Sequence, residues 1–162
     1  MRPCLDSYRT FLRNAPNLRL ERREECHIRE EQMPDQLKPG AVLFAKDIAR
    51  VARFYAELVP MTATLVQADL IVLECDHFQL VVHPIPQHIA RSIRIASPPV
   101  RRTEVAAKLI LPVSDIGEAR AKAPALGGEL NPPGREFEAR GFRACDGCDP
   151  EGNVVQFRQN AL

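Results

Sequence analysis

Residues 41–48 read Ala-Val-Leu-Phe-Ala-Lys-Asp-Ile, and residues 109–116 read Leu-Ile-Leu-Pro-Val-Ser-Asp-Ile. In both stretches a short apolar run, typical of a buried strand, is followed by an aspartate that can cap a helix. The same shift of 68 positions also superimposes Leu58 on Leu126. An internal repeat is therefore the main architectural signal of this chain.

The segment after the first stretch predicts one helix and three strands. Apolar residues recur at helical spacing from Ile48 to Leu58, and Pro60 ends this helix. Runs rich in β-branched and apolar residues, separated by short polar turns, then predict strands at Thr62–Gln67, Leu70–Cys75 and Phe78–Val82.

The segment around the second stretch predicts the same order of elements. A strand is expected at Val105–Val113, either at a sheet edge or bulged at Pro112, because Pro112 lacks an N–H donor. A helix follows Asp115 and ends at Gly127-Gly128, and further strands are expected at Glu136–Cys145 and Asn153–Arg158. Each copy alone covers its sheet with one helix, so the two copies must pack together to bury a common core.

The composition excludes several classes of protein. The chain has 162 residues, 45% of them apolar, and a formal net charge of +1, which suits one soluble globular domain. The balanced charge gives no signal for nucleic acid, and no apolar run approaches the roughly 18–20 residues of a membrane span. No apolar segment with a small-residue cleavage site follows Met1, so secretion is not expected.

The five cysteines are interpreted as reduced thiols of a cytoplasmic protein. Their number is odd, and a chain of this length needs no disulfide to fold. Cys145 and Cys148 have the spacing of a zinc or redox pair, but no second Cys/His pair at zinc spacing accompanies them.

The first 38 residues differ in composition from the rest of the chain. They interleave charges of both signs and contain few strongly apolar residues, so residues 1–38 are expected to be a disordered extension. Met33, just before the turn-rich segment that leads into the first strand, is interpreted as the physiological start.

The repeat and the segment Asp-Pro-Glu-Gly-Asn-Val-Val-Gln-Phe at residues 149–157 resemble the vicinal oxygen chelate superfamily. This superfamily includes glyoxalases, bleomycin-resistance proteins and extradiol dioxygenases. The resemblance covers residues 39–160 and implies an α+β glyoxalase/bleomycin-resistance fold, in which two βαβββ modules pair into a curved mixed sheet around a cleft. Module one is expected at residues 40–86, a linker at 87–103 and module two at 104–160.

The resemblance also implies where a metal would bind. Metal-using members place ligands on the first, fourth, fifth and eighth strands, which correspond here to Gly40, Val81 (or Gln79 or His83 beside it), Lys108 and Gln156. Glycine and valine offer no donor atom, and a lysine would set one cation against another. No metal ligand and no divalent-metal cofactor are therefore expected.

Alternation along the strands indicates which side chains would line the implied cleft: Phe44, Gln79, His83, Lys108, Ile110, Gln156 and Arg158. An apolar floor with a few cationic groups suits a small organic molecule that carries a carboxylate or another oxyanion. Each polar residue also has an ordinary structural interpretation. Lys108 can reach the sheet edge, His83 can belong to a loop, and Gln156 and Arg158 can face solvent.

Two main classes of function are consistent with these features. The first is a binding protein that sequesters a small organic ligand, and the missing metal ligands favour it. The second is an enzyme (a lyase, isomerase or dioxygenase) with Lys108 or His83 as the candidate general base of a metal-free site. A dimerisation or regulatory module is a third interpretation. A homodimer is considered in each case, with the modules paired within one chain or swapped between two.

Overall fold

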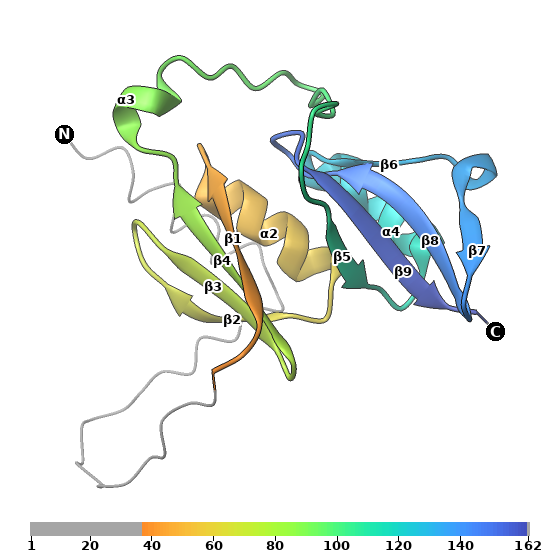
Figure 1. The fold of residues 1–162 in the computed structure, drawn as a ribbon. Helices are drawn as coiled ribbons and strands as arrows, with labels where there is room; N and C mark the ends of the chain where they lie inside the picture. Colours follow the sequence, from red (N-terminus) through yellow and green to blue (C-terminus); the bar gives the residue numbers. More distant parts are fainter. Residues whose placement is uncertain (1–36, 162) are drawn as a thin grey trace, which may run out of the picture.

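The computed structural model describes residues 37–161. The expected extension over residues 1–38, apart from Leu37 and Lys38, and the proposed start at Met33 lie outside the described residues. Two sheets lie on either side of a central helix, α2, as Figure 1 shows. No helix within residues 37–161 is long and apolar enough to cross a membrane.

Module one contains the helix and all four strands close to where the sequence predicts them. Its elements are β1 (Gly40–Ala45), α2 (Ile48–Leu58), β2 (Thr62–Val66), β3 (Ile71–Cys75) and β4 (Phe78–Pro84). The sheet order is β1-β4-β3-β2, with β1 parallel to β4 and the other pairs antiparallel. Asp47 caps α2 by accepting the backbone N–H of Arg50 at 2.9 Å, as expected. A short helix, α3 (Gln87–Ala90), begins the connection to module two.

Module two repeats this order with a divided second strand, because β6 and β7 pair with two parts of β8. It contains β5 (Leu109–Pro112), α4 (Ile116–Lys122), η1 (Ala123–Leu126), β6 (Glu129–Leu130), η2 (Pro133–Arg135), β7 (Phe137–Ala139), β8 (Phe142–Cys148) and β9 (Val154–Asn160). The sheet order is β5-β9-β8-β6, and β7 also pairs with β8. The edge position expected for the strand with Pro112 is confirmed.

Two expectations for module two are wrong. The single strand predicted at Glu136–Cys145 is a hairpin, because Arg140 and Gly141 take positive φ angles of 47° and 79° and reverse the chain between β7 and β8. The strand predicted at Val105–Val113 is shorter than expected. Only β5 pairs with another strand, and as an edge strand it pairs with β9 alone.

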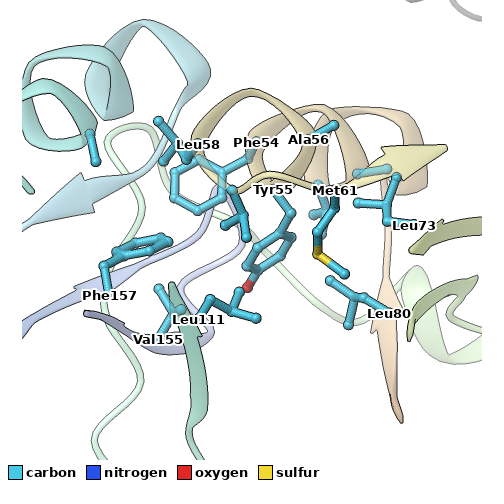
Figure 2. Packing of buried hydrophobic residues seen from close by; sticks show 14 of the residues in the cluster. Phe54, Tyr55, Ala56, Leu58, Met61, Leu73, Leu80, Leu111, Val155 and Phe157 are labelled. Carbon is cyan, nitrogen blue, oxygen red and sulfur yellow. The ribbon is translucent and has the colours of Figure 1, made fainter. Parts of the chain in front are cut away.

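Both sheets turn one face toward α2, which confirms the predicted common core. Phe54 and Tyr55 of α2 are fully buried, and Figure 2 shows them between side chains of the two modules. Leu73 and Leu80 approach from the first sheet, while Leu111, Val155 and Phe157 approach from the second. The chain therefore has the expected α+β architecture of two modules, with α2 packed on the first sheet and α4 on the second.

The turn at residues 149–153 fastens module two to the start of α2. The buried carboxylate of Glu151 accepts the backbone N–H groups of Lys46 and Asp47 at 3.0 and 2.8 Å. The buried Asp149 accepts the backbone N–H of Glu151 at 2.9 Å and the Tyr55 hydroxyl at 3.2 Å. Burial raises the pKa of Asp149 despite these hydrogen bonds. The segment that carries the resemblance thus has a structural role at the module junction.

Candidate functional site

The side of the first sheet that points away from α2 is apolar and exposed. We call it face one, and it includes Val42, Phe44, Gln79, Val81 and His83. Val42 is 57% exposed and Phe44 is 56% exposed, although both lie in the middle of a strand. The rings of Phe44 and His83, paired across β1 and β4, are stacked with centroids 6.1 Å apart. Face one is an ordered apolar surface with one imidazole.

Gln79 lies at the end of face one where β1 begins, opposite Gly40. Its side-chain amide donates to the backbone oxygen of Lys38 at 3.1 Å, and its methylene packs directly over Gly40. A Cβ added at Gly40 would lie 2.5 Å from Cγ of Gln79, so this position has no room for a larger side chain. Beside it, Lys38 pairs with Glu74 at 3.0 Å.

The side of the second sheet that points away from α2 carries the remaining predicted residues. We call it face two, and it includes Ile110, Phe142, Asp146, Gln156 and Arg158. Ile110 is opposite Gln156 on one side, and Asp146 is opposite Gln156 on the other. Lys108, immediately before β5, extends its ammonium group to Asp146.

A chain of hydrogen bonds orders the polar groups of face two. The Lys108 ammonium donates to both carboxylate oxygens of Asp146, at 2.9 and 3.0 Å. The Gln156 amide donates to Asp146 at 2.9 Å, and its oxygen accepts from Nε of Arg158 at 2.8 Å. The Arg158 guanidinium carbon lies 4.1 Å from the centroid of the Phe142 ring. Because Gln156 is only 4% exposed and both its ends are engaged, the amide has a single favourable orientation.

Asp146 is ionised at neutral pH as a result of this arrangement. Burial by itself raises the pKa of Asp146, but the hydrogen bonds from Gln156 and Lys108 and the lysine charge together hold it below its usual value. The carboxylate therefore neutralises Lys108, and Arg158 is the cation of this chain of groups that has no carboxylate partner.

The sequence analysis did not identify Asp146 and Phe142. Asp146 lay beyond the predicted strand end, between two cysteines whose spacing drew attention to the thiols. Counting outward from the turn at 149–153 pairs position 148 with 154 and position 146 with Gln156, as observed. This count and the two-residue alternation of side chains along a strand were the signals from which Asp146 could have been identified.

Cys145 and Cys148 lie on opposite faces of β8, because three positions separate them along a strand. The buried Cys145 thiol contacts the backbone oxygen of Asn131 at 3.4 Å on the core side. Both thiols are free, and burial raises the pKa of each. The interpretation of these residues as ordinary thiols, and not a redox or zinc pair, agrees with this arrangement.

Face one belongs to the first sheet and face two to the second, and each points away from the shared core. Within residues 37–161, no hydrogen bond, ion pair or ring contact joins the Phe44–His83 group to the Lys108–Arg158 group. Pockets of about 190, 210 and 370 Å³ are present, but their linings contain none of the seven predicted residues. One chain thus presents two separate open faces.

The donors on these faces do not fit a divalent cation. No group of three or more His, Cys, Asp or Glu side chains converges anywhere in the described part of the chain. Of the four positions implied by the resemblance, Gly40 is packed under Gln79, Val81 is a hydrocarbon and Lys108 is a cation. The fourth, Gln156, already uses both ends of its amide.

No family model matches the chain, and no curated protein matches its sequence. Solved structures do match its fold. A glyoxalase/bleomycin resistance protein/dioxygenase family enzyme from Burkholderia phytofirmans has a TM-score of 0.52 at 18% identity, over 75% of this chain and 96% of that one. The fosfomycin resistance protein FosX from Mesorhizobium loti has a TM-score of 0.51 at 11% identity, over 80% and 96%. TnmS3, an antibiotic binding protein from a Streptomyces species, has a TM-score of 0.50 at 18% identity, over 80% and 100%.

Proposed function

We propose that this chain, which has the glyoxalase/bleomycin-resistance fold, binds a small organic molecule without a divalent metal, between face one of one copy and face two of a second copy. The observation that carries this proposal is the presence of two ordered faces that point away from the core, one on each sheet, with Val42, Phe44 and Ile110 exposed on them. TnmS3, an antibiotic binding protein with a similar fold, supports a role in binding a small molecule.

The need for a second copy follows from enclosure. Binding pockets for organic molecules bury about 70–90% of the ligand surface, which a single open sheet face cannot do. Val42, Phe44 and Ile110 are each more than half exposed in one chain, although such residues normally pack against a partner. A two-fold symmetric dimer that places face one against face two covers all three and creates two equivalent sites.

Metal independence is proposed from the chemistry of the donors. The Lys108 ammonium supplies a fixed positive charge beside Gln156, and Asp146 holds it there with both oxygens. Both hydrogen bonds of the Lys108 nitrogen go to Asp146, so this nitrogen is already engaged as a donor. This geometry does not favour Lys108 as the general base of an enzyme.

Subunit complementation tests the proposed location of the site. The probe is phenylnaphthylamine, a neutral aromatic compound whose fluorescence rises in apolar surroundings. Phe44→Ser alters face one, Ile110→Ser alters face two, and Ile89→Ser is the control because Ile89 is 45% exposed on α3, away from both faces. The wild type and the control are expected to be dimers that bind two probes with equal affinity.

Each face variant alone is expected to bind the probe at least about tenfold more weakly, since an apolar contact is lost in both of its sites. In a heterodimer of the two variants, one site contains both substitutions and the other contains neither. Co-expressed heterodimers should therefore recover one wild-type site per dimer. A monomeric wild type in sedimentation velocity, or a heterodimer with no recovered site, would contradict the proposal.

A further inference from the structure

We propose that Arg158 is the anion receptor of this site, binding a carboxylate, sulfonate or phosphate group of the ligand through its two terminal nitrogens. This inference rests on the proposed function and adds the chemical class of the ligand. The ligand is then an amphiphile, with an apolar body and one oxyanion.

The first observation is the number of free donors. A guanidinium group has five N–H donors in a fixed plane. Arg158 uses its Nε donor on the Gln156 oxygen at 2.8 Å, and its terminal nitrogens meet no acceptor within residues 37–161. These four N–H groups form the fork that binds two oxygens of an oxyanion in parallel hydrogen bonds.

The second observation is that the fork is held in place before any ligand arrives. The Arg158 guanidinium carbon lies 4.1 Å from the centroid of the Phe142 ring, and Nε of the same group donates to the Gln156 oxygen. These two contacts hold the guanidinium group in one orientation. Gln156 is in turn fixed by Asp146. Holding a long side chain in its bound geometry reduces the entropy lost when the ligand binds. An arginine that only increased solubility would need neither support.

The third observation is the local charge. Asp146, the carboxylate nearest to Arg158 in this chain of groups, is already neutralised by Lys108. Arg140 adds a second guanidinium group 6.0 Å from the centroid of the same Phe142 ring. By contrast, Arg120 and Arg143 on the core side of this sheet share the carboxylate of Glu136. Arg158 therefore gives face two a net positive charge, whereas Arg120 and Arg143 on the core side are paired with Glu136.

The apolar surroundings define the rest of the ligand. Ile110 lies beside Gln156 on face two, and Phe44 and Val42 are the exposed apolar residues of face one. In the proposed dimer the oxyanion would bind Arg158 while the apolar body packs against the partner's Phe44. A neutral compound of the same shape would use the apolar contacts but not the fork.

Two fluorescent probes that differ by one sulfonate group test this inference. Anilinonaphthalene sulfonate carries the oxyanion, and phenylnaphthylamine is its neutral counterpart. The wild-type dimer is expected to bind the sulfonate at least about tenfold more tightly, in line with a charge-assisted pair of hydrogen bonds. Raising the salt concentration should reduce this preference.

Arg158→Gln is expected to abolish the preference for the sulfonate and to leave the affinity for the neutral probe within about twofold. Arg158→Lys should restore only part of the preference, because an ammonium group lacks the planar fork. Arg91→Gln, which removes one exposed charge from the linker, is the control and should keep the full preference. Far-UV circular dichroism verifies that each variant is folded.

The outcomes separate the two proposals. If the wild type binds both probes equally, or if Arg158→Gln keeps the preference for the sulfonate, the role of Arg158 is wrong while the proposed binding site stands. If the wild type binds neither probe, the proposed site fails and the anion receptor fails with it.

Discussion

At the scale of single residues, Gln156 determines how charge is distributed on face two. Its amide nitrogen donates to Asp146 and its oxygen accepts from Arg158, so one neutral side chain separates a neutralised ion pair from an unpaired cation. An acidic residue at this position would pair with Arg158 and repel Asp146. An aliphatic residue would leave the Arg158 Nε without an acceptor. A buried glutamine satisfies both neighbours without adding charge.

Lys108→Met tests the electrostatic part of this arrangement. The hydrogen bond from Gln156 lowers the pKa of Asp146 most, and the hydrogen bonds and charge of Lys108 come next. The variant removes the contribution of Lys108, so the pKa of Asp146 should rise. It is measured by NMR titration of the Asp146 carboxyl carbon, with Lys122→Met as the exposed control because Lys122 lies 3.8 Å from Glu118 on α4. An Asp146 titration identical to that of the wild type would contradict the assigned contact.

The same variant should change the pH dependence of stability. Because the pKa of Asp146 is lowered by folding, its contribution to stability is present above the unfolded-state pKa of about 4 and is lost as the pH falls through the folded-state value. Lys108→Met should therefore lose less stability than the wild type between about pH 6 and pH 3, by less than about 1 kcal/mol because the pair is partly exposed. Urea unfolding at the two pH values measures the difference.

At the scale of elements, α2 is unusual because it is apolar on more than one side. Its buried residues include the adjacent Phe54 and Tyr55, whose rings lie between side chains of the two sheets. The Phe54 ring lies 6.2 Å from the ring of Phe157 in module two, and the Tyr55 hydroxyl donates to Asp149. A helix of this kind is buried between two layers and does not lie on a surface.

Phe54→Ala should therefore destabilise both modules at once. We expect a loss of about 3–5 kcal/mol in the free energy of unfolding, as for other fully buried aromatic residues. Leu65→Ala is the matched apolar control, because Leu65 is 38% exposed at the edge of the first sheet and should cost less than about 1.5 kcal/mol. Equal losses for the two variants would show that α2 is not the shared core.

Local signals allowed most of the elements to be predicted from the sequence. The capping aspartates, Pro60 and the turn at 149–153 each act within a few residues, so the order of helices and strands in both modules follows from them. The reversal at Arg140-Gly141 was missed because Arg140 is not a residue type that usually takes a positive φ. The predicted strand therefore ended at Cys145, and Asp146 fell outside it.

The arrangement of the candidate site was harder to predict than its members. Period-two alternation correctly separates the residues that point away from the core, such as Phe44 and Arg158, from those that enter it. It does not say whether two sheets meet through their open faces or through a helix between them. That choice depends on the full circumference of α2, and the sequence analysis considered only one helical stripe, from Ile48 to Leu58. Phe54 belongs to the part that was not considered.

At the scale of the whole molecule, a single core should produce a single unfolding transition. The apolar cluster runs from Leu73 and Leu80 through α2 to Leu111 and Phe157 without a boundary between the modules. Far-UV circular dichroism and amide hydrogen exchange in β3 and in β9 should therefore report the same free energy of unfolding, within about 0.5 kcal/mol. Faster global exchange in one sheet than in the other would show that the modules unfold separately.

Because the common core lies behind both sheets, alternate positions along β1, β4 and β5 have separate tasks. Every second side chain keeps the protein folded, and the ones between are free to change with little effect on folding. A combinatorial library restricted to Val42, Phe44, Val81, His83 and Ile110 should accordingly contain mostly folded members. Selection from such a library would yield binders for new compounds on an unaltered scaffold, which gives a physical reason why one architecture accommodates many chemically unrelated guests.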